Sequence, residues 1–470
     1  MHDFNIFAQF IIQFLLKTGI LKHKAIAITV IIVIFLLLGL TGENLSGYNT
    51  PGHHVAPVSS SSSSLNGVSI SHQLRNSDSE FSGSEAFDHT FSNFLKQHGI
   101  KGASVAIALH GRLLYARGYG YADEENKVEM EPYHILRIAS VSKLLTATAI
   151  MKLIDQGKLT LDSKVFGKNG LLNDSAYLSY RDKRYEKITI RHLLSHTAGW
   201  SKRNGDPVFT PHSVARKMKT SLPVDIPATI KYALSMSLTY SPGTHYSYSN
   251  LGYVILGQII SKLSGKPYED YIQQEILEPL GIFDMHIGNS LVSDRFWNES
   301  RYYQLRYTTH SEAYDGSGET VPALYGGYDM HLLGAAGGWL ASPSELMKFI
   351  LSIDGDSSVT QILSKKTIED MTTPDKEVHR TLGWGGTDDD GNLWRTGSLI
   401  GTNALVIKRK SGLTWIVILN SSGPHQKSIP YYILKTMEQG IDSVRNWPDI
   451  DLFTYKKMDS ATPLETGLVN

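Results

Sequence analysis

The sequence predicts an α/β (α+β) fold: one antiparallel sheet built from both ends of the globular region, flanked by helices, with an inserted helical lobe. Two hairpin patterns, and the helical segments between them, lead to this prediction. Residues 103–109 and 112–121 are rich in apolar and aromatic side chains and flank a His-Gly dipeptide, a two-residue loop suited to a β-hairpin. Residues 404–408 and 413–419 flank a Lys-Ser-Gly turn in the same way.

The segments between the two hairpins are mostly helical, among them residues 140–156, 251–263 and 344–353. Strands at both ends with helices between them favour a single sheet that the two ends build together and the helices cover. We therefore expect the two hairpins to join, and part of the helical region to form a lobe of its own.

Length and composition describe an ordinary globular protein. The chain has 470 residues, enough for one large or two medium domains with a substantial core. Its 45 basic and 45 acidic residues cancel, so no net field favours nucleic acid as a partner. Cysteine is absent, which excludes a disulfide framework, a thiolate metal site and a cysteine nucleophile, but does not identify the compartment.

The N-terminal part of the chain predicts a membrane anchor. Residues 25–42 form an uncharged, mostly apolar run, near the lower limit of about 17–25 residues for a membrane-spanning helix. Three lysines precede the run, and no Lys or Arg follows it before Arg75. This bias places residues 1–24 in the cytoplasm and the rest of the chain outside. A cleaved signal peptide, giving a secreted protein, is the alternative, although the leading segment is long and no A-x-A site follows.

The region after the anchor has the composition of a stalk. Residues 43–82 contain two prolines, six consecutive serines and several Gly and Asn residues, with few large apolar side chains to offset the entropy of ordering. We expect a flexible tether here, a globular domain over residues 83–442 and a C-terminal tail over residues 443–470.

Ser140 and Lys143 open the apolar segment 140–156. Residues three apart lie on one face of a helix, about 5–6 Å apart at Cβ, so the amine can reach the hydroxyl. Lys143 is the only charged residue between Arg137 and Lys152, and burial lowers the pKa of a lysine, so that a neutral amine can act as a general base. The N–H groups of the first turn can stabilise an oxyanion. A helix cap beside a surface lysine is the alternative interpretation.

A second candidate motif is Tyr248-Ser249-Asn250, which follows a Pro-Gly turn and precedes a helical run. It is predicted to lie on a loop that meets a helix, where functional side chains often project. A phenol near a lysine can accept or give a proton, and Asn250 can hold a substrate carbonyl or Lys143 itself. In a chain with 24 tyrosines, a tyrosine-rich loop without function is the alternative.

A third candidate motif is Trp394-Arg395-Thr396-Gly397-Ser398, followed by a strand-like run. A cation followed by a small residue and glycine on an edge strand lets a substrate lie against the backbone while the charge meets a substrate carboxylate. By spacing alone, this motif is weak evidence for a substrate-binding role.

Together the three motifs resemble those of the serine β-lactamase and penicillin-binding-protein superfamily, most closely its class C β-lactamase-like, D-Ala-D-Ala carboxypeptidase and esterase branch. Ser-x-x-Lys, Tyr-x-Asn and a basic residue followed by Thr-Gly is the order of that family. Further blocks that carry the resemblance are GYGYADEENKV before Ser140, HLLSHTAGW at 192–200, PGTHYSYSNLGYVILGQIISKLSGKPYEDY at 242–271, EPLGIFDMHIG at 278–288, AAGGWLASPSEL at 335–346 and LGW at 382–384. The resemblance covers roughly residues 85 to 440.

The resemblance implies a β-lactamase/transpeptidase-like fold and an acyl-enzyme mechanism. Ser140 would attack a carbonyl, Lys143 would take its proton, Tyr248 would pass that proton to the leaving group, and Asn250 would orient the acyl amide. Backbone N–H groups of Ser140 and Ser398 would form the oxyanion hole. In the class A pattern the second motif begins with serine and a glutamate activates the deacylating water, so the tyrosine here favours the other branch. No metal or organic cofactor is implied.

Substrate binding would fall to Asn250 and to the third motif, Arg395, Thr396, Gly397 and Ser398. The family usually has Lys or His at the position of Arg395. Arginine is bulkier, planar and permanently charged, so it can bind a carboxylate bidentately but cannot donate a proton as His can. A catalytically silent relative that acts as a scaffold therefore stays an alternative to an active hydrolase.

His192 and His196 raise the possibility of a zinc site, since two histidines four residues apart on a helix can bind the metal. No Glu follows His192 in the H-E-x-x-H arrangement, and the block matches a structural motif of the family. We therefore expect both histidines to be structural and no metal to be bound.

The expected protein is a membrane-anchored, extracytoplasmic serine hydrolase with esterase, peptidase or amidase activity on small acyl or D-amino-acid-type substrates. Efficient β-lactamase activity is a less favoured specialisation, because specificity lies in loops that these motifs do not describe. Expected partners are a small-molecule or peptide substrate and the membrane, with no nucleic acid and an open oligomeric state. The alternatives are a silent scaffold or ligand-binding protein and a slow-turnover penicillin-binding protein.

Overall fold

The computed structural model describes residues 69–201, 203, 205–375, 378–423 and 427–454. The chain divides into two units, residues 1–65 and 66–470, and all of the described residues belong to the second. Among these residues, no helix is both long and apolar enough to cross a membrane. The predicted anchor over residues 25–42 lies outside the described residues, as does most of the predicted stalk.

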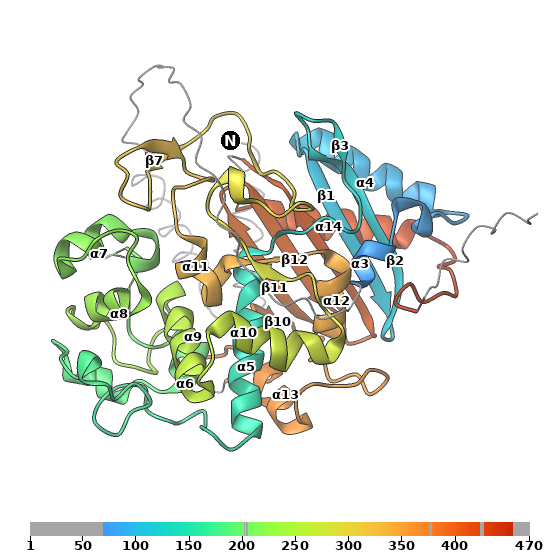
Figure 1. The fold of residues 1–470 in the computed structure, drawn as a ribbon. Helices are drawn as coiled ribbons and strands as arrows, with labels where there is room; N and C mark the ends of the chain where they lie inside the picture. Colours follow the sequence, from blue (N-terminus) through green and yellow to red (C-terminus); the bar gives the residue numbers. More distant parts are fainter. Residues whose placement is uncertain (1–68, 202, 204, 376–377, 424–426, 455–470) are drawn as a thin grey trace, which may run out of the picture. The chain divides into compact units, whose positions relative to one another are not determined.

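The second unit is built on a seven-stranded sheet (Figure 1). Its strands are β1 (Gly102–Leu109), β2 (Arg112–Asp123), β3 (Val128–Glu129), β10 (Gly386–Thr387), β11 (Leu393–Leu399), β12 (Thr402–Lys408) and β13 (Leu413–Leu419). They lie in the order β10-β11-β12-β13-β1-β2-β3, and every neighbouring pair is antiparallel. The first hairpin joins the last through β1 and β13, in the register Val105 opposite Val417. The prediction of one antiparallel sheet shared by both chain ends is confirmed.

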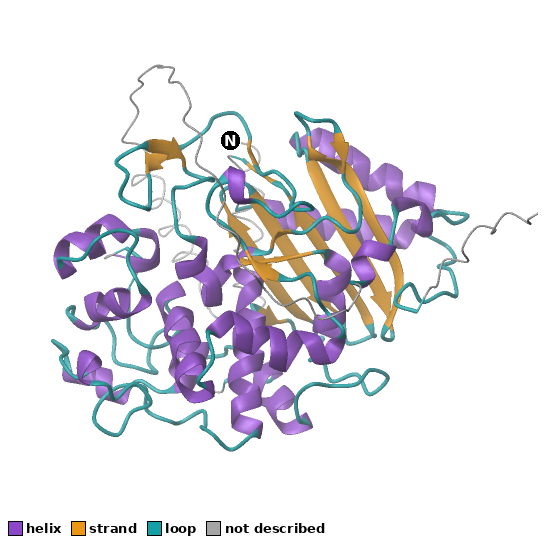
Figure 2. Cartoon of the chain, viewed as in Figure 1, coloured by secondary structure: helices purple, strands orange, loops and turns teal. Residues whose placement is uncertain are grey.

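Helices cover both faces of the sheet (Figure 2). The helices are α3 (Ile70–Gln73), α4 (Ser84–His98), α5 (Lys143–Asp155), α6 (Ile190–Leu194), α7 (Pro211–Met218), α8 (Ile226–Leu234), α9 (Asn250–Ser264), α10 (Tyr268–Ile272), α11 (Met330–Leu333), α12 (Pro343–Leu351), α13 (Lys365–Thr372) and α14 (Ile429–Ser443). Side chains alternate between the two faces of a strand. Val105 and Ile107 of β1 accordingly pack with α4 and α14, whereas Ala106 and Ala108 belong to the larger core that contains α5 and α12.

The inserted helical lobe lies beside the sheet, with α6, α7, α8 and α9 in green in Figure 1. Helix α9 packs against α5, which connects this lobe to the sheet. Short strands complete the unit: β4 (Leu136–Arg137), β9 (Trp339–Ala341) and β5 (His286–Ile287) form one small sheet, β6 (Tyr303–Gln304) pairs with β14 (Ser421–Ser422), and β7 (His310–Glu312) pairs with β8 (Thr320–Pro322). Strand β9 brings the chain after α11 against β4, directly before Ser140.

The folded unit extends further at both ends than the sequence indicates. Within the predicted stalk, α3 and a 3₁₀ turn (Asn76–Ser79) pack on the body, and Leu74 is only 1% exposed. Ser79 Oγ donates a hydrogen bond to the Ala116 carbonyl (2.8 Å). Within the predicted tail, the Leu452 N–H donates to the Leu113 carbonyl (2.8 Å). Buried leucines and hydrogen bonds to β2 therefore attach both segments to the domain, which composition alone could not indicate.

Candidate active site

Ser140 lies on a tight turn at the start of α5. A 3₁₀ turn (Ala139–Ser142) leads directly into the helix, which begins at Lys143. Ala139 has φ of 47°, in the left-handed region that side chains other than glycine rarely adopt, so the backbone is strained beside the candidate nucleophile. Ser142 Oγ donates to the Ala139 carbonyl (2.6 Å), a bond that helps to hold this strained turn.

The amine of Lys143 is completely buried and surrounded by acceptors. Its Nζ donates to Asn250 Oδ1 (2.8 Å) and to the Ala336 carbonyl, and lies 3.3 Å from Ser140 Oγ. An ammonium group has three donors and finds three acceptors here. In the neutral amine the two remaining N–H groups can keep Asn250 and Ala336, which leaves the lone pair directed at Ser140. The structure therefore brings together the serine and lysine of the first motif.

Two effects hold the pKa of Lys143 well below its ordinary value. Burial disfavours the charged form, and the nearby positive charge of Arg395 acts in the same direction, while Asp206 opposes them. The first of these effects, burial, is the one that the sequence predicts for this lysine. A neutral amine beside a serine hydroxyl can serve as a general base.

The second motif, which belongs to the helical lobe, brings Tyr248 and Asn250 next to Ser140 and Lys143. The hydroxyl of Tyr248 lies 2.5 Å from Ser140 Oγ. Ser249 caps α9 by accepting a hydrogen bond from the Gly252 N–H (3.3 Å). The helix begins at Asn250 itself rather than after it, because this cap directs the asparagine into the first turn, where its side chain faces Lys143.

Two residues outside the three motifs support this loop: Asp206, which the sequence did not indicate, and His196, which it predicted to be structural. Asp206 accepts hydrogen bonds from the Asn250 backbone N–H (2.9 Å) and side-chain amide (3.1 Å), which orients the Asn250 oxygen toward Lys143. His196 Nδ1 accepts from the Ser249 N–H (3.3 Å), and its ring lies 4.4 Å from the Tyr248 ring. Burial holds the pKa of His196 well below its ordinary value, so its ring is neutral.

His192 and His196 do not form a metal site in the described structure. His192 is in α6 and its Nδ1 accepts from the Thr189 N–H (3.2 Å), whereas His196 lies beyond the end of the helix. Within the described ranges, no group of three or more His, Cys, Asp or Glu side chains could hold a metal ion.

The third motif lies on β11, alongside the Ser140 turn. Strand β10 pairs with Leu393 and Trp394, so this pairing ends before Arg395. A Cβ atom on Gly397 would lie 2.1 Å from the Ile138 carbonyl oxygen and 3.2 Å from the Ser140 nitrogen. Only glycine lets the strand approach this closely. Ser398, next along the strand, is exposed and its hydroxyl donates to Asn403 Oδ1 (3.2 Å).

Arg395 points back at the nucleophile turn. Its Nε donates to the Ser140 carbonyl (2.8 Å), and the residue is only 4% exposed. Its Nη2 is buried without a hydrogen-bond partner in the described structure. The arginine thus forms part of the support of the Ser140 turn.

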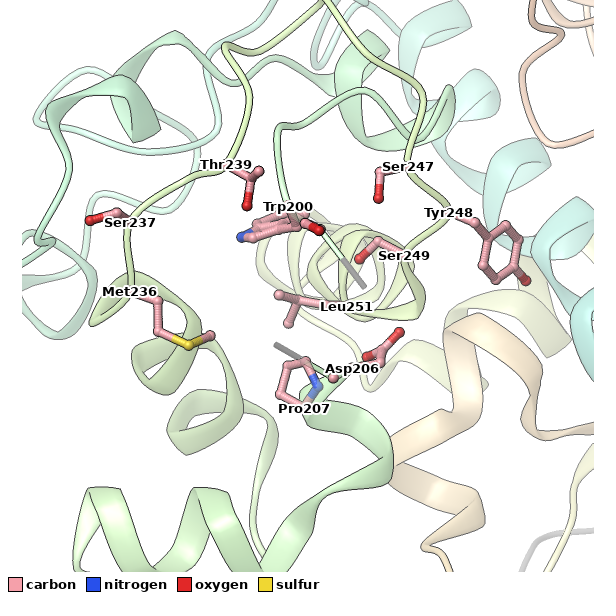
Figure 3. A pocket seen from close by; sticks show the side chains of 12 residues that line it. Trp200, Asp206, Pro207, Met236, Ser237, Thr239, Ser247, Tyr248, Ser249 and Leu251 are labelled. Atoms are coloured by element: carbon pink, nitrogen blue, oxygen red, sulfur yellow. The ribbon is translucent and has the colours of Figure 1, made fainter. Parts of the chain in front are cut away.

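These side chains border a cleft of about 420 Å³. It is lined by Ser140, Ser195, His196, Tyr246, Tyr248, Arg380, Thr381, Trp384, Gly385, Trp394, Arg395, Thr396 and Ser398. A second hollow lies on the other side of the Tyr248 loop, between Trp200, Pro207 and Leu251, and the Tyr248 ring points away from it (Figure 3). Its volume of about 40 Å³ is a tenth of that of the first. The larger cleft is therefore the candidate substrate site.

A family model described as Beta-lactamase matches residues 87–437, which span the sheet, the helical lobe and all three motifs. The chain belongs to this family. It therefore has the β-lactamase/transpeptidase fold, within a superfamily of serine hydrolases that includes penicillin-binding proteins and esterases.

Three relatives illustrate this range. PbpX of Bacillus subtilis (strain 168) is 28% identical over 332 residues, which cover 70% of this chain and 73% of PbpX. Esterase EstB of Burkholderia gladioli is 29% identical over 200 residues, 42% of this chain and 50% of the esterase. Penicillin-binding protein 4* of Bacillus subtilis (strain 168) is 30% identical over 230 residues, 48% of this chain and 46% of that protein. The chain thus spans half or less of the latter two relatives.

Solved structures show the same fold. The octameric penicillin-binding protein homologue from Pyrococcus abyssi has a TM-score of 0.56 and 27% identity, and the match covers 75% of this chain and 76% of that chain. D-amino acid amidase from Ochrobactrum anthropi SV3 has a TM-score of 0.58 and 21% identity, and the match covers 78% and 99% of the two chains. At this level of identity the amidase supports the fold alone.

Proposed function

We propose that this chain is a serine hydrolase that forms an acyl-enzyme at Ser140. The observation that carries the proposal is the position of Lys143. Its buried amine is held by Asn250 and Ala336 with its remaining valence directed at Ser140 Oγ. A general base requires the neutral amine, and burial of Lys143 favours that form.

The proposed reaction begins when Ser140 Oγ attacks the substrate carbonyl carbon and its proton passes to Lys143. The oxyanion would be stabilised by the backbone N–H groups of Ser140 and Ser398. Collapse of the tetrahedral intermediate breaks the bond to the leaving group, which takes the proton through the Tyr248 hydroxyl. A water molecule then attacks the ester by the same route, returning the proton to Ser140 Oγ and releasing the acid.

The substrate class we propose is a small ester, or an amide of D-amino-acid type. The similarity to esterase EstB supports the ester. The volume of the cleft suits a small acyl donor. Under this proposal, Thr396 and Gly397 present the backbone of β11 to the substrate, and Asn250 meets the acyl group.

A second candidate is a protein that acylates but barely turns over. Relatives named as penicillin-binding proteins favour it, and so does Arg395, which cannot donate a proton where the family usually has Lys or His. In that case the acyl-enzyme would form at Ser140 and persist.

Covalent labelling tests the proposal. The full-length chain would be treated with a fluorophosphonate and, separately, a penicillin, and its intact mass measured. Ser175, an exposed serine on a distant turn, provides the matched control. We expect adducts in the wild type and in Ser175→Ala but none in Ser140→Ala. The lifetime of the penicillin adduct distinguishes hydrolysis from trapping, and the same adducts in Ser140→Ala would overturn the proposal.

A further inference from the structure

Asp206 is an acidic residue in direct contact with the second motif. It precedes the 3₁₀ turn Pro207–Phe209 in the helical lobe, and its Oδ1 accepts from the Val208 N–H (3.2 Å). Its Oδ2 accepts from both the backbone N–H (2.9 Å) and the side-chain amide (3.1 Å) of Asn250. One oxygen therefore fixes the carboxylate to its own turn, while the other faces Asn250.

This carboxylate determines which end of the Asn250 amide faces Lys143. A side-chain amide has an oxygen that accepts and an NH₂ group that donates, at two ends of nearly the same shape. An ionised carboxylate only accepts, so the NH₂ group of Asn250 must face Asp206. The amide oxygen is then left for Lys143, whose Nζ donates to it at 2.8 Å.

The orientation of this amide decides what a neutral lysine can do. A neutral amine has two N–H donors and one lone pair, and the Ala336 carbonyl can only accept from it. With the Asn250 oxygen as the second acceptor, both donors are used and the lone pair is free for the Ser140 proton. A reversed amide would donate its NH₂ group to the lone pair instead. An N–H of Lys143 would then face Ser140, which is the wrong polarity for a base.

Asp206 itself does not line the substrate cleft. It lines the small hollow on the other side of the Tyr248 loop (Figure 3). A substrate bound beside Ser140 would not contact it. Any influence of Asp206 on the reaction must therefore pass through Asn250 or through its charge.

The charge of Asp206 is a second influence that can be separated from the first. It opposes burial and Arg395 in setting the pKa of Lys143, because a nearby negative charge favours the ammonium form. Loss of this charge should lower that pKa further. The titratable and charged groups that face Lys143 from the surrounding elements are Ser140, His196, Asp206, Tyr248, Tyr253 and Arg395.

We propose, on the basis of the proposed function, that Asp206 is a positioning residue of the reaction. It holds the Asn250 amide with its oxygen toward Lys143, and so keeps the lone pair of the lysine for the proton of Ser140.

Two substitutions test the proposal. Asp206→Ser keeps a hydroxyl that can cap Val208 but removes the charge and the oxygen that faces Asn250, whereas Asp206→Asn removes the charge and can keep an oxygen toward Asn250. We expect plateau kcat of the full-length chain on the uncharged ester 3-acetoxybenzamide to fall about ten- to a hundredfold in Asp206→Ser, and less in Asp206→Asn. The acidic limb of kcat/KM should move to lower pH in both.

The matched control is Asp225→Asn, which removes the charge of another capping aspartate in the same lobe, at the exposed start of α8. Its kinetics should equal those of the wild type. A double-mutant cycle then shows whether Asp206 acts through the amide. If it does, Asp206→Ser should lower kcat little further once Asn250 is replaced by alanine. Equal losses in both backgrounds would overturn the proposal, because Asp206 would then only support the loop.

A measurement without turnover separates this proposal from the proposed function. The side-chain NH₂ signal of Asn250 in the ¹H–¹⁵N spectrum of the full-length chain is identified by its loss in Asn250→Ala. Its exchange with water should be slow in the wild type and about tenfold faster in Asp206→Ser. That result would support the orientation even if no ester were hydrolysed. Equal exchange in the wild type and Asp206→Ser would overturn it.

Discussion

The hydroxyl oxygens of Ser140 and Tyr248 lie 2.5 Å apart, closer than the 3.3 Å between the Ser140 hydroxyl and the Lys143 amine. Ser140 therefore has two possible proton acceptors, which come from different parts of the fold. The Lys143 amine is held by hydrogen bonds to Asn250 and Ala336, whereas Tyr248 borders the cleft. This difference suggests a division of roles: the lysine takes the proton of the nucleophile, and the tyrosine hands a proton to the departing group.

Replacing Tyr248 with phenylalanine tests this division. Loss of the hydroxyl should lower kcat for esters about 10²- to 10⁴-fold, the usual contribution of a positioned acid or base. The loss should be smallest for good leaving groups such as p-nitrophenol, which need no proton. A series of phenyl esters with leaving groups of different pKa measures it.

The control for this series is Tyr307→Phe, at a tyrosine that is 61% exposed and does not line the cleft. It should behave as the wild type. A loss in Tyr248→Phe that did not depend on the leaving group would show that the hydroxyl acts only on Ser140.

The pH dependence of acylation depends on Arg395. Burial is the main reason for the lowered pKa of Lys143, and the charge of Arg395 adds to it. Arg395→Gln should therefore raise the pKa of Lys143. A smaller fraction of the amine is then neutral at a given pH, so the acidic limb of kcat/KM shifts to higher pH.

This shift is measured with the uncharged 3-acetoxybenzamide, so that the charge of the substrate does not enter the profile. Arg445→Gln, at an exposed position outside the cleft, should leave the limb in place. A lower plateau with an unshifted limb in Arg395→Gln would mean that the arginine only holds the backbone of Ser140.

Local patterns in the sequence predicted the parts of the fold that depend on neighbours in the chain. The hairpin of β1 and β2 is encoded by apolar strands around a His-Gly loop. The helix predicted over residues 140–156 is present as α5, but it begins at Lys143, and Ser140 lies on the 3₁₀ turn before it. The joining of β1 to β13 followed from the position of strands at both ends. The family resemblance then placed the three motifs at one site.

Contacts between residues far apart in the sequence could not be predicted in this way. Asp206 orients Asn250 from 44 positions away, and Arg380 lies over Tyr246, yet neither belongs to a recognisable motif. The polar composition of residues 43–82 predicts a stalk. Its Asn76 instead accepts from the Gly118 N–H (2.7 Å) and donates to the Met130 carbonyl (2.8 Å), which only the folded sheet provides.

Gly397 should tolerate no side chain. A Cβ atom there would lie 2.1 Å from the Ile138 carbonyl oxygen, so Gly397→Ala must push β11 away from the Ser140 turn. We expect the free energy of unfolding to fall by about 1–3 kcal/mol. A displacement of this size at the site should lower kcat about 10²-fold. Urea unfolding and ester kinetics measure the two effects.

Gly423→Ala is the matched control, because its nearest contact would be Leu305 Cβ at 3.4 Å, an ordinary packing distance. Activity close to that of the wild type in Gly397→Ala would contradict the close approach of β11 to the nucleophile turn.

We expect the free energy of unfolding to depend on pH through Glu345, a buried carboxyl outside the active site. This carboxyl is fully buried in α12 and accepts a hydrogen bond from Ser69, which attaches the N-terminal segment to the body. Burial raises its pKa from 4.5 to about 7, although the Ser69 bond opposes the shift. The folded state therefore holds a proton that the unfolded state releases, so stability is full below pH 4.5 and falls as pH rises to about 7.

Glu345→Gln keeps the shape and the acceptor for Ser69 but cannot ionise. It should abolish the loss of unfolding free energy between pH 4.5 and 7, which is about 3 kcal/mol for a pKa difference of this size. Urea unfolding at pH 5 and pH 8 measures that loss, with Glu129→Gln on the exposed strand β3 as control. The same fall with pH in Glu345→Gln as in the wild type would assign it to another group. A flat profile in Glu345→Gln would show that ionisation of this one buried carboxyl causes the fall in unfolding free energy.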